Sequence, residues 1–275
     1  MHFRVAHETT YRYDLPVVLG PHLLRLSPRR DGVRLHAERL DIDPPPFARR
    51  EETDAWGNRV MHLGFAGETT LFRVASSFDL DTDVPEPPGE GPEPLPWSVA
   101  AGDGREATCV FSSGPAVRAF AEEAAAAAGH RPLAFLDRLA AEIVSRTDLG
   151  IRPDGHARTA EETLTLRQGA CRDVTVLFLE SARALGIAGR FVSGYQARPA
   201  VEDGRRHLHA WAEVFLPGAG WRGWDVTHGT RVTDGHVALS AAPSQAGTMP
   251  IEGGFSFTGA SVKSTLDYRI AIEAG

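Results

Sequence analysis

The sequence has little lysine and no basic stripe. Lys263 is the single lysine, so nearly all of the 29 basic residues are arginine. The 36 acidic residues outnumber them and give a formal net charge of −7. A nucleic-acid-binding surface needs clustered basic residues to neutralise phosphates. We therefore expect no nucleic-acid partner.

Long apolar stretches and cysteine are also scarce. No apolar run approaches the roughly 20 residues of a transmembrane helix. The start, MHFRVAHETTYRYDLP, lacks the apolar centre of a signal peptide. Two cysteines, Cys109 and Cys171, do not make a disulfide framework. These features predict a cytoplasmic protein without membrane contact.

The remaining pattern predicts an α+β fold. The first stretch, FRVAHETTYRY, alternates in the way of a strand, and several β-rich stretches follow. We predict an N-terminal antiparallel β domain over residues 1–83 and a proline-rich linker over 84–97, which could instead be an ordered strap. Two helices, a helix after Cys171 and a run of strands then predict a core over 98–275. In this core the Cys171 helix packs on an antiparallel sheet.

The stretch QGACRDVTVLFLESARALG places Cys171 at the start of a helix. A thiol attacks as thiolate, and a helix N-terminus or a neighbouring imidazole lowers its pKa. The Cys171 main-chain N–H could also stabilise an oxyanion. A lone cysteine beside an apolar helix is more often a small buried residue. We keep that interpretation for Cys109.

A base for Cys171 can come from the stretch HLHAWAEVFL. Alternation puts Leu208, Ala210 and their apolar companions on the core face and places His209 on the other face. The short turn PGAG joins this strand to GWRGWD, so the two strands predict a hairpin. Asp225 can then lie beside His209 and orient its ring. The alternative for Asp225 is a turn-capping role.

The ordered motifs GACRD, SGYQ, HAWAEVF and GWRGWDVTHG resemble the transglutaminase-like superfamily of papain-type thiol enzymes. The stretches FRVAHETTYRYDLPV and DAWGNRV resemble the β domain that precedes this core in bacterial members. The resemblance covers most of the chain.

The resemblance implies a papain/transglutaminase-like fold with a triad of Cys171, His209 and Asp225. Cys171 would form a thioester with an amide carbonyl, and no cofactor or metal would be needed. Tyr195 in SGYQ matches a family tyrosine that packs near the site, and Gln168 is a candidate for a second oxyanion donor. Asp173 matches an acidic residue that would stabilise the helix N-terminus.

The sequence departs from the family pattern at two places. Asp225 is followed by Val226 rather than proline, and residues 240–254, SAAPSQAGTMPIEGG, lack the glycine-arginine-aspartate-tyrosine run of related chains. If this segment shapes the cleft, the substrate preference differs or activity is lost.

Four functional hypotheses remain open at this point. The favoured one is a thiol hydrolase that cleaves a peptide, isopeptide or glutamine-type amide of a peptide or protein substrate. The others are a transglutaminase that transfers the acyl group to an amine, a non-catalytic scaffold that binds a peptide or partner protein, and a metal site of His207, His209 and His228. The oligomeric state has no signal in the sequence.

Overall fold

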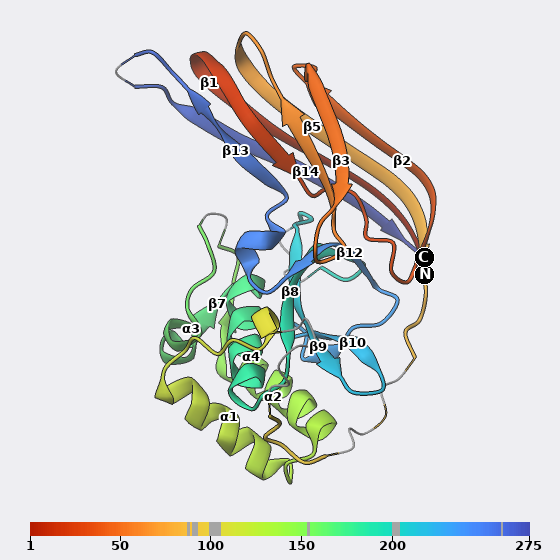
Figure 1. The fold of residues 1–275 in the computed structure, drawn as a ribbon, viewed down its shortest axis with the longest axis vertical. Coiled ribbons are helices and arrows are strands. Elements are labelled where there is room, and N and C mark those ends of the chain that lie inside the picture. Colours follow the sequence, from red (N-terminus) through yellow and green to blue (C-terminus); the bar gives the residue numbers. More distant parts are fainter. Residues whose placement is uncertain (87–88, 90–92, 99–105, 153–154, 200–203, 260) are drawn as a thin grey trace.

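The computed structural model describes residues 1–275 except 87–88, 90–92, 99–105, 153–154, 200–203 and 260. Two antiparallel sheets lie one above the other, and helices cover the lower sheet (Figure 1). The upper, N-terminal sheet contains β1 His2–Leu24, β2 Val33–Asp43, β3 Ala48–Thr53, β4 Arg59–Gly64, β5 Glu68–Thr82, β13 Ile251–Ser256 and β14 Ser264–Ala274. The core sheet contains β8 Gly189–Gln196, β9 His209–Leu216, β10 Gly220–Asp225, β11 Thr230–Arg231 and β12 His236–Ala242.

The helices and short elements belong to the lower part. The helices are α1 Pro115–Ala127, α2 Pro132–Arg146, α3 Ala160–Leu166 and α4 Cys171–Ala184. The short elements are the 3₁₀ turns η1 Glu106–Thr108 and η2 Gln245–Thr248 and the two-residue strands β6 Asp148–Leu149 and β7 Gln168–Gly169. Within the described residues no helix is both long and apolar enough to cross a membrane.

The long strand β1 organises the N-terminal sheet. Its alternation buries Phe3, Val5 and His7 on one face, as the sequence predicts. Along one edge β1 pairs with β5 and β4, and along the other it pairs with β14 and β13. The predicted antiparallel β domain is therefore present, although it has more strands than residues 1–83 supply.

The last two strands correct the predicted extent of the core. Phe3 to Tyr13 of β1 pair with Ser264 to Ala274 of β14, and β13 continues along the same edge. The strands β13 and β14 thus belong to the N-terminal sheet, although they lie within the core predicted over 98–275. Alternation shows that a segment is a strand, but it does not show which sheet edge the strand joins.

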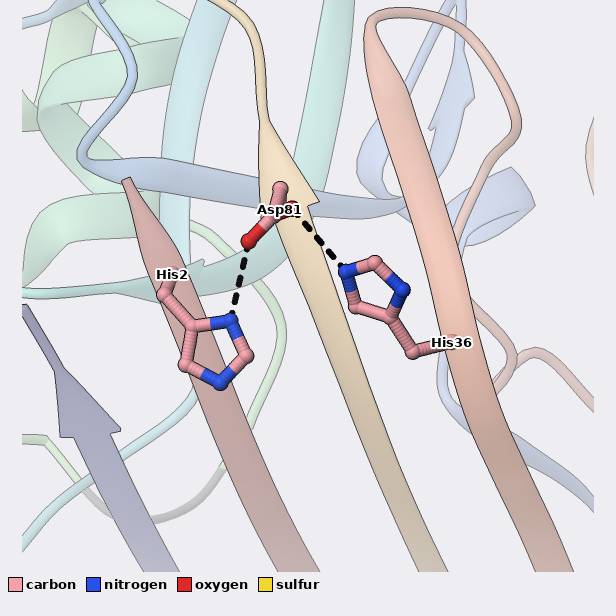
Figure 2. A group of neighbouring side chains, drawn as sticks. All are labelled: His2, His36 and Asp81. Atoms are coloured by element: carbon pink, nitrogen blue, oxygen red, sulfur yellow. Dashed lines mark hydrogen bonds and ion pairs between the residues drawn. The ribbon is translucent and has the colours of Figure 1, made fainter.

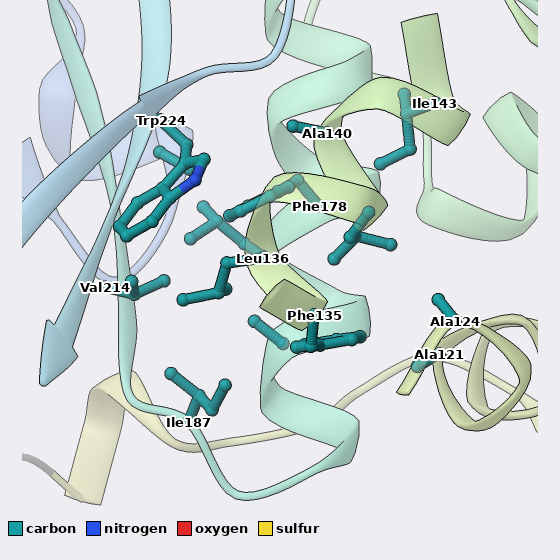
Figure 3. Close-up of a cluster of buried hydrophobic side chains, with 14 of the residues drawn as sticks. Ala121, Ala124, Phe135, Leu136, Ala140, Ile143, Phe178, Ile187, Val214 and Trp224 are labelled. Carbon is teal, nitrogen blue, oxygen red and sulfur yellow. The ribbon is translucent and has the colours of Figure 1, made fainter. Parts of the chain in front are cut away.

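The core sheet has the order β11-β10-β9-β8-β12, and α4 packs across it. The predicted apolar stripe of α4 is buried, including Val174, Leu177 and Phe178. Figure 3 shows Phe178 between α2 and the sheet, where its ring stacks on Trp224 with centroids 6.4 Å apart. This packing fixes the height of α4 over the sheet, and with it the position of the residue that begins the helix.

Hydrogen bonds of two segments, the DAWGNRV turn and the predicted linker, hold them against the core. The buried Asn58 side chain donates to the Ala241 carbonyl and accepts from the Ala241 N–H, at 2.9 and 2.7 Å, so the DAWGNRV turn holds β12. In the predicted linker, Leu95 is buried and its N–H donates to the His130 carbonyl at 2.9 Å. The Trp97 N–H donates to Leu185 over the same distance. These described residues form an ordered strap, while 87–88 and 90–92 of the linker lie outside the described residues.

Candidate active site

Cys171 is the first residue of α4, and a buried carboxylate holds the chain there. Asp173 is fully buried and accepts hydrogen bonds from the Ala170 N–H at 2.8 Å and the Arg158 N–H at 2.8 Å. The Arg152 guanidinium donates to the same carboxylate at 2.7 Å. The prediction that Asp173 stabilises the helix N-terminus is consistent with these contacts.

The Cys171 thiol lies next to the imidazole of His209, the first residue of β9, and interacts with it. Burial raises the pKa of the thiol, but the His209 hydrogen bond and charge, the Ala210 N–H and the Arg172 charge outweigh it. The pKa of Cys171 therefore lies below its ordinary value. This environment favours a thiolate paired with an imidazolium.

Asp225 lies on the other side of the His209 ring. The distance from His209 Nε2 to Asp225 Oδ2 is 2.9 Å, which leaves Nδ1 for the thiol. The predicted β9–β10 hairpin forms and sets Trp224 opposite Ala212, so Asp225 follows at the end of β10. Burial lowers the pKa of His209, but Asp225 and Cys171 raise it to about 9. The structure thus places the three predicted residues next to one another, with His209 hydrogen-bonded to Asp225 and interacting with the Cys171 thiol.

A second histidine shares the aspartate, and no motif of the sequence predicts it. His236, the first residue of β12, has its Nε2 2.9 Å from Asp225 Oδ2, the same oxygen that His209 contacts. The other oxygen, Oδ1, accepts the main-chain N–H groups of Thr227 and His228 at 3.1 and 3.4 Å. Burial raises the pKa of Asp225, but the hydrogen bonds and charges of His209 and His236 hold it well below its ordinary value. The carboxylate is therefore ionised and fixed in place.

A cavity of about 330 Å³ opens onto Cys171 and His209. The N-terminal sheet forms one wall through His7, Thr9 and Tyr11 of β1 and through Leu266, Tyr268 and Ile270 of β14. Gln245 and residues 248–251 form another part of the lining. The segment that departs from the family pattern therefore does shape the cleft.

Two candidate residues of the sequence analysis lie elsewhere. Gln168 is exposed in β7, outside the described cavity lining, and its carbonyl accepts from Arg158 at 2.8 Å. Tyr195 is fully buried away from the lining, where its hydroxyl is 2.7 Å from His7 Nδ1. Gln168 is thus exposed and outside the described lining, and its role as an oxyanion donor stays a prediction. Tyr195 contacts the cleft indirectly, since it holds His7 in the wall.

Two groups of the described residues have the composition of a metal site. One is His209, Asp225 and His236 in the chain just described. The other is His2, His36 and Asp81 on three neighbouring strands of the N-terminal sheet (Figure 2). The predicted trio of His207, His209 and His228 is neither of these, and the His207 ring contacts the Tyr268 hydroxyl at 2.7 Å instead.

The surface group of Figure 2 is balanced by arginine. His2 Nδ1 lies 2.9 Å from Asp81 Oδ1, and His36 Nε2 lies 2.9 Å from Asp81 Oδ2. The Arg34 guanidinium donates to Oδ2 as well, at 2.8 Å. Hydrogen bonds from these three side chains hold the pKa of Asp81 well below its ordinary value. A guanidinium competes with a cation for the carboxylate, so these residues fit an ion-pair network better than a metal centre.

Comparisons with known proteins agree with this geometry. The sequence model "Bacterial transglutaminase-like N-terminal region" matches residues 3–81, and the model "Transglutaminase-like superfamily" matches residues 118–226. The chain belongs to the bacterial transglutaminase-like proteins. The matched core contains Cys171, His209 and Asp225. The expected papain/transglutaminase-like α+β fold is confirmed.

Relatives of this transglutaminase-like chain extend over nearly its full length. It is 29% identical to an uncharacterized protein of Mycobacterium tuberculosis over 272 residues, which covers 91% of this chain and 86% of that protein. An uncharacterized protein of Mycobacterium leprae is 28% identical over 273 residues and 94% of each chain. The crystal structure of a candidate cysteine protease from Cytophaga hutchinsonii superposes with a TM-score of 0.74 at 19% identity and covers 100% of this chain and 91% of that one. That superposition shows a shared fold.

Proposed function

We propose that this protein is a thiol hydrolase that cleaves an amide of a peptide or protein substrate through a thioester on Cys171. The observation that carries the proposal is the chain from Cys171 through His209 to Asp225, with the thiol at the cavity. A buried cysteine without a catalytic role needs neither an imidazole at its sulfur nor a carboxylate behind that imidazole.

The geometry supports the following steps. The Cys171 thiolate attacks the amide carbonyl, and the N–H groups in the first turn of α4 face the developing oxyanion. His209 then donates its Nδ1 proton to the leaving amine and leaves a thioester on Cys171. Water attacks the thioester and His209 accepts its proton, so that the acid is released and the Cys171 thiolate leaves beside the protonated His209. Asp225 holds the ring and stabilises its charged form throughout.

Hydrolysis and transfer to an amine use the same residues and differ in the group that resolves the thioester. We favour water because it needs no second binding site. The two reactions are distinguished by adding a primary amine to the reaction with a substrate. Hydrolysis then gives mainly the released acid, and transfer gives mainly the amine-linked product.

The first test needs no substrate. Alkylation of Cys171 by iodoacetamide is followed site by site from pH 5 to 10, and Cys109 in the same chain serves as the reference thiol. We expect Cys171 to react rapidly well below pH 8, because His209 stabilises its thiolate. His209→Ala should remove this reactivity and return Cys171 to the profile of an ordinary thiol.

Two outcomes would contradict the proposal. One is a Cys171 profile that resembles that of an ordinary thiol in the wild-type protein. The other is an early reactivity that survives in His209→Ala. Cys171→Ala should keep the thermal unfolding transition of the wild type, and circular dichroism of that variant separates a lost nucleophile from a lost fold.

A further inference from the structure

The cavity beside Cys171 has a charge that the whole chain does not share. The chain carries a net charge of −7, yet the described cavity lining contains neither aspartate nor glutamate. It contains four arginines, Arg152, Arg172, Arg205 and Arg206. Charged residues of one sign in a low-dielectric cleft concentrate ligands of the opposite sign. The cavity is therefore suited to an anionic ligand.

Among the four arginines, Arg206 has the contacts that best suit the binding of an anion. Its guanidinium donates to the main-chain carbonyls of Gln196 and, at 2.8 Å, Ala197, just after β8. Arg152, by contrast, is already paired with the buried Asp173 carboxylate at 2.7 Å. Carbonyl oxygens orient a guanidinium but leave its charge in place. Burial also lowers the pKa of Arg206, which shows that the group is partly removed from water.

A second polar group points to a ligand in the same cavity. Thr227 lines the cavity and is about nine-tenths buried, and its hydroxyl has no hydrogen-bond partner within the described residues. Buried hydroxyls are nearly always paired, since an unpaired one loses its bond to water without replacement. Thr227 follows Asp225 by two residues, its main-chain N–H donates to that carboxylate, and it shares the cavity lining with His209.

We propose that Arg206 binds a carboxylate of the substrate, so that the enzyme prefers amides whose acyl part carries an acidic group near the scissile bond. This inference rests on the proposed function, because it assumes that the cavity holds the acyl part. A guanidinium offers a carboxylate two parallel hydrogen bonds and retains its charge at any working pH. The carboxylate can belong to an acidic side chain or to a chain end.

Matched alkylating reagents test this. Bromoacetyl-glutamate α-amide carries a side-chain carboxylate, bromoacetyl-glutamine carries a terminal carboxylate, and bromoacetyl-glutamine α-amide is neutral. We expect at least one anionic reagent to alkylate Cys171 about three to ten times faster than the neutral one. Which anionic reagent is faster identifies the source of the carboxylate.

Variants assign the effect to Arg206. In Arg206→Gln the ratio of anionic to neutral rates should fall about threefold or more, and Arg206→Lys should keep part of the preference. Arg138→Gln removes the same charge from an exposed position on α2 and should keep the wild-type ratio. The neutral reagent corrects each variant for any change in the thiolate population.

The outcomes separate this inference from the proposed function. Equal rates of all three reagents in the wild type, or an unchanged ratio in Arg206→Gln, would overturn the role of Arg206. The iodoacetamide profile of Cys171 reports on the thiolate independently, so the proposed function can stand when the inference fails. If the thiol is not activated, the ratio is still measurable and decides whether Arg206 attracts an anion to the cavity.

Discussion

The protein contains two clusters with the same composition and almost opposite surroundings. In each, two histidine rings lie 2.9 Å from one aspartate: His2 and His36 around Asp81, and His209 and His236 around Asp225. The side chains of the first cluster are 28–42% exposed, and those of the second 0–12%. Identical distances therefore do not imply identical chemistry.

Solvent and arginine account for the difference. Arg34 balances Asp81 at the surface, whereas the buried Asp225 is balanced by the two histidines and by main-chain N–H groups. Water screens the first cluster and leaves little energy in its contacts. In the second cluster a charge that loses its partner has no water to replace it. The buried cluster can therefore hold a proton on His209, and the surface cluster serves to balance charge.

The largest expected effect comes from removing the charge of the buried aspartate, Asp225. Asp225→Asn should slow alkylation of Cys171 at pH 6 by about 100-fold, because an ordinary thiol with a pKa near 8.5 is less than about one per cent thiolate there. Asp81→Asn is the matched control and should keep the wild-type rate. A rate within threefold of wild type for Asp225→Asn would show that His209 does not depend on the aspartate.

An intermediate effect concerns stability in acid. Both aspartates have a pKa below that of the unfolded chain, so each contributes stability above pH 4 that is lost as the pH falls further. For the buried Asp225 we expect a contribution of about 2 kcal/mol or more. Urea unfolding at pH 6 and pH 3 should show a smaller loss of stability in Asp225→Asn than in the wild type.

The surface aspartate provides the contrast for that measurement. Asp81→Asn should leave the difference between pH 6 and pH 3 close to that of the wild type, and 0.5 M salt should remove what remains because exposed pairs are screened. A larger change for Asp81→Asn than for Asp225→Asn would reverse the comparison between the two clusters.

The smallest expected effect concerns the outer histidine of each cluster. His236→Leu removes a donor from Asp225 and leaves more negative charge for His209, so the Cys171 alkylation profile should move about half a unit toward lower pH. His236→Gln retains a donor and should restore the wild-type profile, and His36→Leu should have no effect. A shift toward higher pH would instead show that His236 keeps the carboxylate in position.

Local patterns were sufficient to predict most of the site. The helix start fixed Cys171, alternation along β9 separated His209 from the apolar face, and the short PGAG turn brought Asp225 onto the neighbouring strand. Each of these depends on residues close in sequence. The family resemblance then supplied the role of the three residues together, which remains a proposal.

The features that were missed depend on distant pairing. His236 reaches Asp225 because β12 pairs with β8 across a shifted register, with His236 opposite Gln196, and a turn pattern does not encode that. The position of Arg206 in the cavity could not be predicted, because its loop has no alternation that shows which way a side chain lies. Tyr195 was expected near the cleft, but the side of β8 on which it lies packs against the N-terminal sheet. Gln168 was assigned by analogy, and the turn before α4 directs it outward.

The pairing of β1 with β14 also bears on how the chain is made. β1 leaves the ribosome long before β13 and β14, yet these strands share one sheet edge from Phe3 to Leu24. Contacts so far apart in sequence are slow to form. During synthesis one edge of β1 therefore stays open until β13 and β14 arrive, and an open strand edge is a target for chaperones or for pairing with a second chain. The wall of the cavity that β1 and β14 form together is completed only then, so the thiol is enclosed after the core strands have been made.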